Sequence, residues 1–247
     1  MGGCYLLERT LGFSGEPTRL ESLYLDRNYS EVEMQAALVS AGCEFRHCDG
    51  IERVIAKLLA EGSVVARFNG PMEFGPRALG NRSILCHAGD PAVNDWLNKK
   101  LQRTEFMPFA PMTIDEDGET MYRNLGRGRF TANFMTMTFD CTETMRRANP
   151  AAVHVDGTAR PQILDAGANP SAFRLLREYK NLTGHGTVIN TSFNIHEEPI
   201  VRTPADALRA FFQAELDYLA MGPFLVMPRH RSDLDRSADA LKKTAYS

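Results

Sequence analysis

The apolar residues of the chain follow a helical period in some stretches and a strand pattern in others. Apolar positions 51, 54, 55, 58 and 59 predict a helix over 49–61. Before it, Ser30 and Glu33 have the spacing of a capping box, which predicts a helix that ends near Gly42. The apolar run 63–70 predicts a buried strand that leads directly into a glycine-rich loop. A helix, a strand and a polar loop in this order form the crevice in which α/β sheets bind ligands.

The second half of the chain predicts further elements in alternation. Helices are predicted to begin at Asp90-Pro91, at Asn169-Pro170 and at Thr203-Pro204, because each pair joins a capping residue to a proline in the first turn. The strand patterns are an edge strand or rigid loop over 106–114, a strand over 131–142, a hairpin over 152–164 that turns at Asp156-Gly157, a buried strand over 187–190 and a closing strand over 219–226. Residues 1–28 show no clean period and are expected to form a lead-in, 29–228 the domain, and 229–247 a polar tail.

Composition limits the class of protein. A chain of 247 residues with 43% hydrophobic and 24% charged residues is large enough for one well-packed domain. The net charge of −3 argues against a general nucleic-acid binder, and no run of eighteen apolar residues predicts a membrane helix. Five cysteines are few, and no secretory signal is visible, so a reduced cytoplasm is the expected setting. Cys43 and Cys48 are too weakly patterned for a metal site and are expected to be structural.

The candidate chemistry gathers in residues 69–103. This stretch holds glycines at 70, 75 and 80 and the cations Arg77, Arg82, Lys99, Lys100 and Arg103. Arginine fits phosphate oxygens and glycine allows close backbone approach, which favours a phosphate or nucleotide site. The alternative is a Gly/Pro turn with solvated basic residues. No GxxxxGK[ST] or GxGxxG motif occurs. Glu73 is interpreted as a loop carboxylate that orients Arg77, rather than as a metal partner.

Several later residues also allow two interpretations. His154 and Arg160 either face a ligand or are ordinary hairpin residues. Thr191, Ser192 and Asn194 offer hydroxyl and amide groups to a ligand, or form a turn that satisfies its own backbone. Residues 115–119 are expected to be a solvated turn rather than a calcium loop. The basic residues 123, 127 and 129 form either a phosphate or RNA clamp or a mobile surface loop.

The sequence MEFGPRALGNRSIL at 72–85 resembles the signature of the carbamoyltransferase family that includes nodulation protein U and antibiotic O-carbamoyltransferases. Six further blocks are similar in the same order, at 97–111, 154–162, 169–176, 188–201, 203–212 and 219–226. The chain is also faintly similar to YrdC-type threonylcarbamoyl-AMP synthases. Lys100-x-x-Arg103 followed by Pro108 resembles their K-x-R…P motif, and NTSFN at 190–194 resembles their S-T-S-A-N.

This resemblance implies an α/β (α+β) fold with a YrdC-like, twisted, mixed, largely open sheet flanked by helices. It implies that the chain is the C-terminal half, which forms carbamoyl-adenylate from ATP and carbamoyl phosphate with Mg²⁺. The N-terminal half of such proteins has a sugar-kinase-like fold, holds iron and passes the carbamoyl group to a hydroxyl. That half is absent from this sequence, so it is the expected partner domain or subunit. No metal ligand is expected in the present chain.

The resemblance also implies the site residues. The catalytic set is Arg77, Arg82, Lys100 and Arg103, and the nucleotide-binding set is Gly75, Asn81, Ser83, His154, Arg160, Thr191, Ser192 and Asn194. The sequence departs from the family pattern at Glu197, where Gly is common, and at Pro71, where Arg is usual. An added carboxylate and a lost cation both weaken anion binding. Two alternatives therefore stay open: a non-catalytic nucleotide-binding module that docks to a separate sugar-kinase-like subunit, and an RNA-binding YrdC-like protein, which the acidic balance opposes.

Overall fold

A computed structural model describes residues 2–13, 15, 20–101 and 109–228. Its strands are β1 (Phe45–His47), β2 (Val65–Phe68), β3 (Arg82–His87), β4 (Ala110–Ile114), β5 (Phe139–Asp140), β6 (Thr158–Ala159), β7 (Gln162–Leu164), β8 (Thr187–Ser192), β9 (Tyr218–Met221) and β10 (Phe224–Val226). Eight of them form one sheet in the order β1-β10-β9-β2-β3-β8-β4-β7, and β5 pairs with β6. The β2–β9 and β4–β7 pairs are parallel and the others antiparallel. This open, mixed sheet confirms the predicted fold class.

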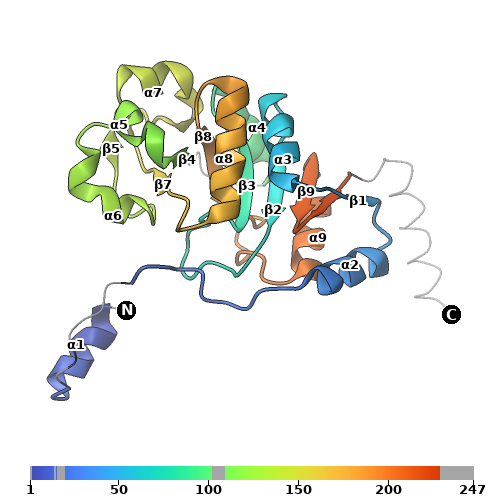
Figure 1. Cartoon of the computed structure of the whole chain (residues 1–247), viewed down its shortest axis with the longest axis horizontal. Coiled ribbons are helices and arrows are strands. Elements are labelled where there is room, and N and C mark those ends of the chain that lie inside the picture. The colour runs from blue at the N-terminus through green and yellow to red at the C-terminus, as the bar shows by residue number, and fades with distance from the viewer. Residues whose placement is uncertain (1, 14, 16–19, 102–108, 229–247) are drawn as a thin grey trace.

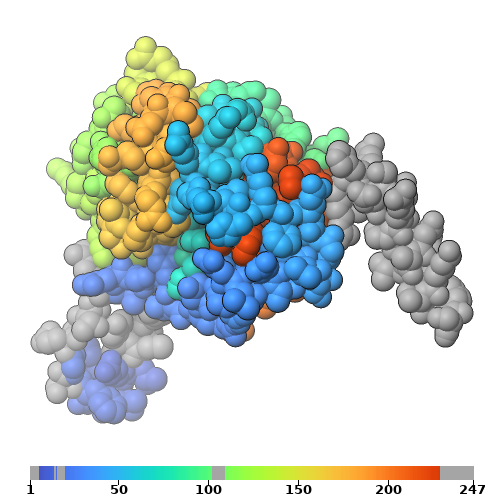
Figure 2. Space-filling model, turned by 45° about the vertical axis from the view of Figure 1, so that its right-hand side comes forward, coloured from blue at the N-terminus to red at the C-terminus, as the bar shows by residue number. Residues whose placement is uncertain are grey.

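Helices cover both faces of the large sheet. Helices α3 (Ile51–Ala60) and α8 (Pro170–Thr183) lie side by side on one face (Figures 1 and 2). The opposite face packs against α2 (Glu31–Ser40), α4 (Ala92–Lys100) and α9 (Pro204–Gln213). The short helices α5 (Gly118–Met121), α6 (Arg129–Ala132) and α7 (Glu143–Ala148) gather beside β4 and β7, with the 3-10 turns η1 (Asp115–Asp117), η2 (Leu125–Gly128) and η3 (Pro150–Ala152). Helix α1 (Gly2–Thr10) stands apart from this body (Figure 1).

Strand β3 separates two hydrophobic cores. Ile84 and Cys86 are buried in the core that contains α2, α4 and α9, whereas Leu85 is buried in the core under α3 and α8. Successive side chains of a strand point to opposite faces, so a run that is apolar on both faces fits a strand in the middle of a covered sheet. The sequence analysis did not predict this strand, because the glycine signature overlaps it and Arg82 begins it.

The predicted helix starts are largely confirmed. The capping box of Ser30 and Glu33 is present at α2, and Thr203 forms a second capping box with Asp206 at α9. The side chain of Asn169 caps α8 by accepting from the N–H of Ala172 at 3.1 Å. Each of these caps satisfies N–H groups that have no partner inside the helix.

Several predicted strands are wrong in detail. Strand β4 lies between β8 and β7 and is not an edge strand, and residues 219–226 form the β9–β10 hairpin rather than one strand. The region 131–142 contains only the two residues of β5, after helix α6. No hairpin forms over 152–164, because β6 pairs with β5 while β7 pairs with β4. Non-local partners decided these pairings, and residue patterns do not encode them.

Two segments expected to be irregular are organised. Residues 115–119 are not a solvated turn, because Asp117 is buried and accepts hydrogen bonds from the N–H of Gly186 and from Lys180. The described part of the lead-in runs along the glycine loop, where Tyr24 forms a bridge with Glu73. Among the described cysteines whose side chains are placed, Cys48, Cys86 and Cys141 are free thiols.

Candidate functional site

The glycine loop between β2 and β3 is built around the buried carboxylate of Glu73. Its Oε1 accepts hydrogen bonds from the backbone N–H groups of Leu79 at 2.8 Å, Asn81 at 2.7 Å and Arg82 at 3.1 Å. The N–H of Gly80 donates to Ser83 Oγ at 2.9 Å. The expectation that Glu73 orients Arg77 is therefore wrong. Glu73 takes up loop N–H groups that would otherwise be free for an anion.

Buried polar side chains hold the carbonyl groups of the same loop. The amide of Gln162 donates to the carbonyl of Leu79 at 2.8 Å, and that of Asn190 donates to the carbonyl of Ala78 at 3.1 Å and to Gln162. Arg67, 2% exposed, donates to the carbonyl of Gly80 and to Ser171 Oγ. Burial lowers the pKa of Arg67 to about 10. The loop backbone is thus fixed from β2, β7, β8 and α8.

These holding residues were missed by the sequence analysis. Arg67, Gln162 and Asn190 lie within predicted apolar strands, where a lone polar residue carries no positional signal. Two signs were available: each is a polar residue on a strand that is otherwise buried, and Gln162 and Asn190 lie in blocks that resemble the family. Buried polar groups need hydrogen-bond partners, and here the loop carbonyls supply them.

Arg82 lies at the start of β3 and is completely buried. Its Nη1 donates to the carbonyls of Asn69 at 2.7 Å and Gly70 at 3.1 Å, and its guanidinium lies 3.7 Å from the centroid of the Phe68 ring. Burial lowers its pKa to about 10, against the opposing charge of Glu73. Nε and Nη2 find no hydrogen-bond partner among the described residues. Arg82 therefore joins the two ends of the loop and keeps two unused donors.

The tip of the loop is exposed and carries Arg77. Gly75 has a φ of +111° there, with open space around it. Burial lowers the pKa of Arg160, and the nearby charge of Arg77 lowers it further. Burial and Arg160 likewise lower the pKa of His154, whose Nδ1 lies 3.1 Å from Thr158 Oγ1.

No carboxylate of the described residues forms an ion pair with Arg77 or Arg160. Arg160 Nε is buried without a hydrogen-bond partner among these residues. We call Arg77 and Arg160 the cationic group, and His154, whose lowered pKa favours the neutral ring, borders it. Three predicted site residues from two separate parts of the sequence are thus brought together.

The other predicted cations lie elsewhere. Lys100 is in the last turn of α4, where its Nζ forms an ion pair with Glu215 at 3.0 Å and lies 5.6 Å from the centroid of the Trp96 ring. Its charge is therefore balanced within the protein. Arg103 and Pro108, the rest of the predicted motif, lie outside the described residues. Of the second basic patch, Arg129 pairs with Asp115.

The predicted polar residues of β8 divide between the two faces of the sheet. Ser192 lies directly opposite Ser83 of β3, so their side chains share one face, whereas Thr191 is buried on the other. Ser192 Oγ donates to Asn194 Oδ1 at 2.7 Å, and Asn194 Nδ2 donates to the carbonyl of Glu198 at 2.7 Å.

Asn81 and Ser83 are likewise engaged inside the protein. Asn81 Nδ2 donates to the carbonyl of Pro71 at 2.8 Å, and Ser83 Oγ accepts from the N–H of Gly80. A contact between any of these polar residues and a ligand stays a prediction.

Comparison with known proteins identifies the class. The family described as Carbamoyltransferase C-terminus matches residues 56–228, and the chain belongs to this family. Nodulation protein NolNO of Sinorhizobium fredii is 34% identical over 251 residues, which cover 100% of this chain and 37% of that protein. Nodulation protein NolO of Bradyrhizobium diazoefficiens is 33% identical, and the match covers 100% of this chain and 46% of that protein. An uncharacterized protein of Methanocaldococcus jannaschii is 40% identical over 174 residues, covering 70% of this chain and 28% of that one. The chain thus spans less than half the length of these relatives.

Among solved structures, Sua5 of P. abyssi, crystallised with L-threonine, shares the fold with a TM-score of 0.51. The likeness covers 74% of this chain and 49% of that chain at 14% identity, which shows the YrdC-like fold alone. In the part of the chain that the structure describes, no helix has both the length and the hydropathy to cross a membrane.

Proposed function

We propose that this chain is the half of a carbamoyltransferase that forms carbamoyl-adenylate from ATP and carbamoyl phosphate, for transfer to a hydroxyl acceptor. The observation that carries the proposal is the cationic group: among the described residues Arg77 and Arg160 have no carboxylate partner, and the buried Arg160 Nε has no hydrogen-bond partner. Like charges at short range disfavour each other's charged state, and a bound anion removes that cost. A phosphate chain is such an anion, and arginine is the side chain that fits it.

Formation of carbamoyl-adenylate depends more on stabilising the charge of the phosphoryl oxygens than on transferring a proton. Hydrolysis of carbamoyl phosphate gives carbamate and phosphate. A carbamate oxygen then attacks the α-phosphorus of ATP, the bond to the bridging oxygen of the β-phosphate breaks, and pyrophosphate leaves. Carbamate is already anionic, so no strong general base is needed. In this proposal Arg77 and Arg160 hold the phosphoryl oxygens, and the fixed loop keeps Arg77 in position.

Neutral groups and Mg²⁺ complete the proposed site. Ser83 and Ser192 offer hydroxyl groups on one face of the sheet, and Asn194 offers an amide that bonds Ser192. Contacts from Lys100 and Arg103 remain part of the proposal. Mg²⁺ would arrive bound to the phosphates of ATP, as it commonly does in nucleotide sites. Iron would belong to a sugar-kinase-like partner, and the reaction would run in the cytoplasm.

The test is ATP–pyrophosphate exchange on the purified chain, followed with labelled pyrophosphate. One arm contains carbamoyl phosphate, a second contains ammonium bicarbonate, whose solutions hold carbamate, and a third contains neither. Exchange only in the first two arms supports adenylate formation. Exchange with carbamate alone also supports it and assigns the hydrolysis of carbamoyl phosphate to the partner half. ATP binding without exchange in any arm would reject the proposal in favour of a non-catalytic nucleotide-binding module.

A further inference from the structure

A second candidate site lies at the end of the large sheet opposite the glycine loop. It is a pocket of about 350 Å³ between α3, α8, the end of β3 and the turn that follows α7. The lining residues used below are Glu61, His87, Gly89, Asn149, Thr183 and His185. Strand β3 begins with Arg82 at the loop and ends with His87 at this pocket, so the two sites are roughly 17 Å apart at about 3.3 Å per residue. The pocket is therefore separate from the cationic group.

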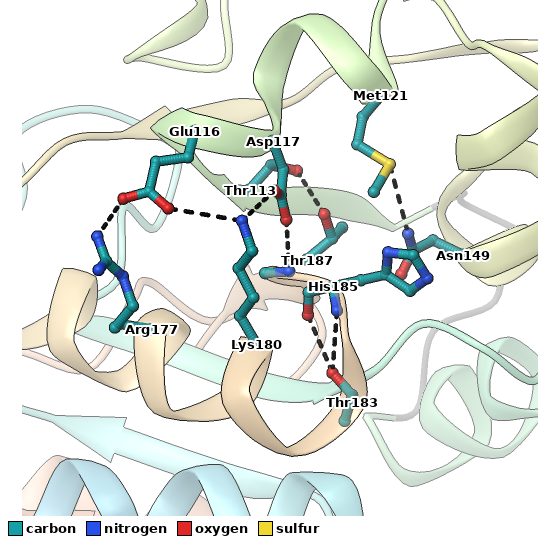
Figure 3. Close-up of polar contacts among 11 residues, drawn as sticks. Thr113, Glu116, Asp117, Met121, Asn149, Arg177, Lys180, Thr183, His185 and Thr187 are labelled. Atoms are coloured by element: carbon teal, nitrogen blue, oxygen red, sulfur yellow. Dashed lines mark hydrogen bonds and ion pairs between the residues drawn. The ribbon is translucent and has the colours of Figure 1, made fainter.

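The wall that carries His185 is held in place from both sides. Asp117 accepts a hydrogen bond from the N–H of Gly186 at 2.7 Å and from Lys180 Nζ at 2.5 Å (Figure 3). Thr183 Oγ1 lies 3.0 Å from the carbonyl of His185, to which it donates. The backbone at Gly186 is packed so closely on Ile114 that a Cβ would overlap it. The turn is thus rigidly anchored, and the pocket is a preformed feature of the fold.

The polar side chains of this pocket have unused hydrogen-bonding capacity. Among the described residues, neither the His87 ring nor the His185 ring has a hydrogen-bond or ion-pair partner. Asn149 is 3% exposed, and its amide makes only a long contact of 4.0 Å with the sulfur of Met121. Figure 3 shows Asn149 and His185 on the same side of the turn. Because the Met121 contact is long, the amide of Asn149 retains capacity to bond a group that enters the pocket.

The electrostatics of the pocket favour a positive charge. Helix α3 ends at Ala60 and helix α8 at Thr183, and both residues line the pocket. The last carbonyls of a helix lack partners inside the helix and form the negative end of its dipole. At the rim, Glu61 forms an ion pair with Lys57 at 3.7 Å, so its carboxylate offsets the charge of that ammonium group. The amide oxygen of Asn149 is a further acceptor.

We propose that this pocket binds a small organic cation with an ammonium group and a second hydrogen-bond donor. Two helix C-terminal ends disfavour anions, and the acceptors match N–H donors. The volume limits the ligand to a small molecule. This site is independent of the proposed adenylate chemistry, and the two proposals can fail separately.

The test compares three four-carbon probes that differ only in their end groups: 1,4-diaminobutane, butane-1,4-diol and succinate. Ring-proton NMR shifts of His87 and His185, assigned with single His→Gln variants, report binding on the full chain, and calorimetry gives the affinity. Diaminobutane is expected to shift both rings and to bind at least tenfold more tightly than the diol and succinate. Equal binding of the diol, preferential binding of succinate, or no shift with diaminobutane would overturn the proposal.

Two variants test whether diaminobutane binds in this pocket. Gly89→Leu fills the pocket, and a Cβ at Gly89 would meet its nearest neighbours at 3.7 Å, an ordinary contact distance. The Gly89→Leu variant is expected to lose binding of diaminobutane. Glu61→Gln is expected to weaken it roughly two- to fivefold, the effect of an exposed ion pair, whereas the exposed control Glu31→Gln leaves it unchanged. Diaminobutane binding that both Gly89→Leu and Glu61→Gln leave intact contradicts the proposal.

Discussion

Glu73 and Asn81 are joined by a hydrogen bond of 2.7 Å from the N–H of Asn81 to a buried carboxylate oxygen. The bond closes the glycine loop, and two further backbone N–H groups converge on the same carboxylate. The loop therefore carries its own internal anion. The backbone N–H groups that bond Glu73 are not available to a ligand. The side chains at the exposed tip are left to contact one.

Glu73→Gln is expected to destabilise the protein by about 1–3 kcal/mol, because the amide replaces one acceptor oxygen with a donor that faces N–H groups. Urea unfolding measures the change, and exposed Glu119→Gln serves as the control. A midpoint equal to that of the parent would show that the loop does not depend on this carboxylate.

Arg77→Ala tests the cationic group. We expect a loss of roughly 2–4 kcal/mol of transition-state stabilisation, by analogy with removal of one oxyanion-hole donor. The free energy of unfolding should change by less than about 0.5 kcal/mol, since Arg77 is exposed. Carbamate-dependent pyrophosphate release is the measurement, and Arg53→Ala, also exposed but on α3, is the matched control. Unchanged ATP affinity and unchanged release in Arg77→Ala would remove this residue from the site.

Glu197→Gly is expected to stabilise the protein by up to about 1 kcal/mol. Glu197 has a φ of +64°, a left-handed conformation that costs an L-residue energy and that glycine adopts freely. This conformation gives a physical reason for the glycine common at this position in the family pattern. Thermal unfolding measures the change, with exposed Glu119→Gly as the control. A fall in the melting temperature at Glu197→Gly as large as in the control would argue against strain at this position.

His154 predicts a pH dependence of stability. Burial, together with Arg160, lowers its pKa in the folded protein, while Asp156 opposes the shift. Above the unfolded value of about 6.5 both states are neutral. As the pH falls below that value the unfolded state takes up the proton first, so the parent loses stability until the folded pKa is passed.

His154→Gln lacks this loss, and the urea midpoints of parent and variant at about pH 7.5 and about pH 5.5 reveal it, since an ordinary histidine titrates between them. The midpoint of the parent should fall further than that of the variant. Asp156 also has a lowered pKa, through its bonds to Thr158, but it acts near pH 4, below this window. Parallel midpoints over this pH range would refute the proposed environment of His154.

Local sequence determined the ends of several of the longer helices. The capping boxes at Ser30 and Thr203, and the cap at Asn169, act within one turn of backbone, so residue spacing alone encodes them. The fourteen-residue signature likewise marked the loop that organises the site, and the family it resembles is the family to which the chain belongs. Arg77, Arg160 and His154 were named as site residues from motifs in two separate blocks.

Tertiary structure decided which strands pair and how each charged side chain is partnered, which local sequence patterns do not encode. Strand β3 is a central strand because β2 and β8 pair with it on either side. The expected hairpin over 152–164 does not form, because β6 pairs with β5 and β7 pairs with β4. Lys100 and Arg82 are both basic residues of the stretch 69–103. Lys100 forms an ion pair with Glu215, whereas Arg82 is buried against the Phe68 ring. The charge that an arginine or lysine offers to a ligand depends on neighbours distant in the chain, because burial and ion pairing are set only when the sheet assembles.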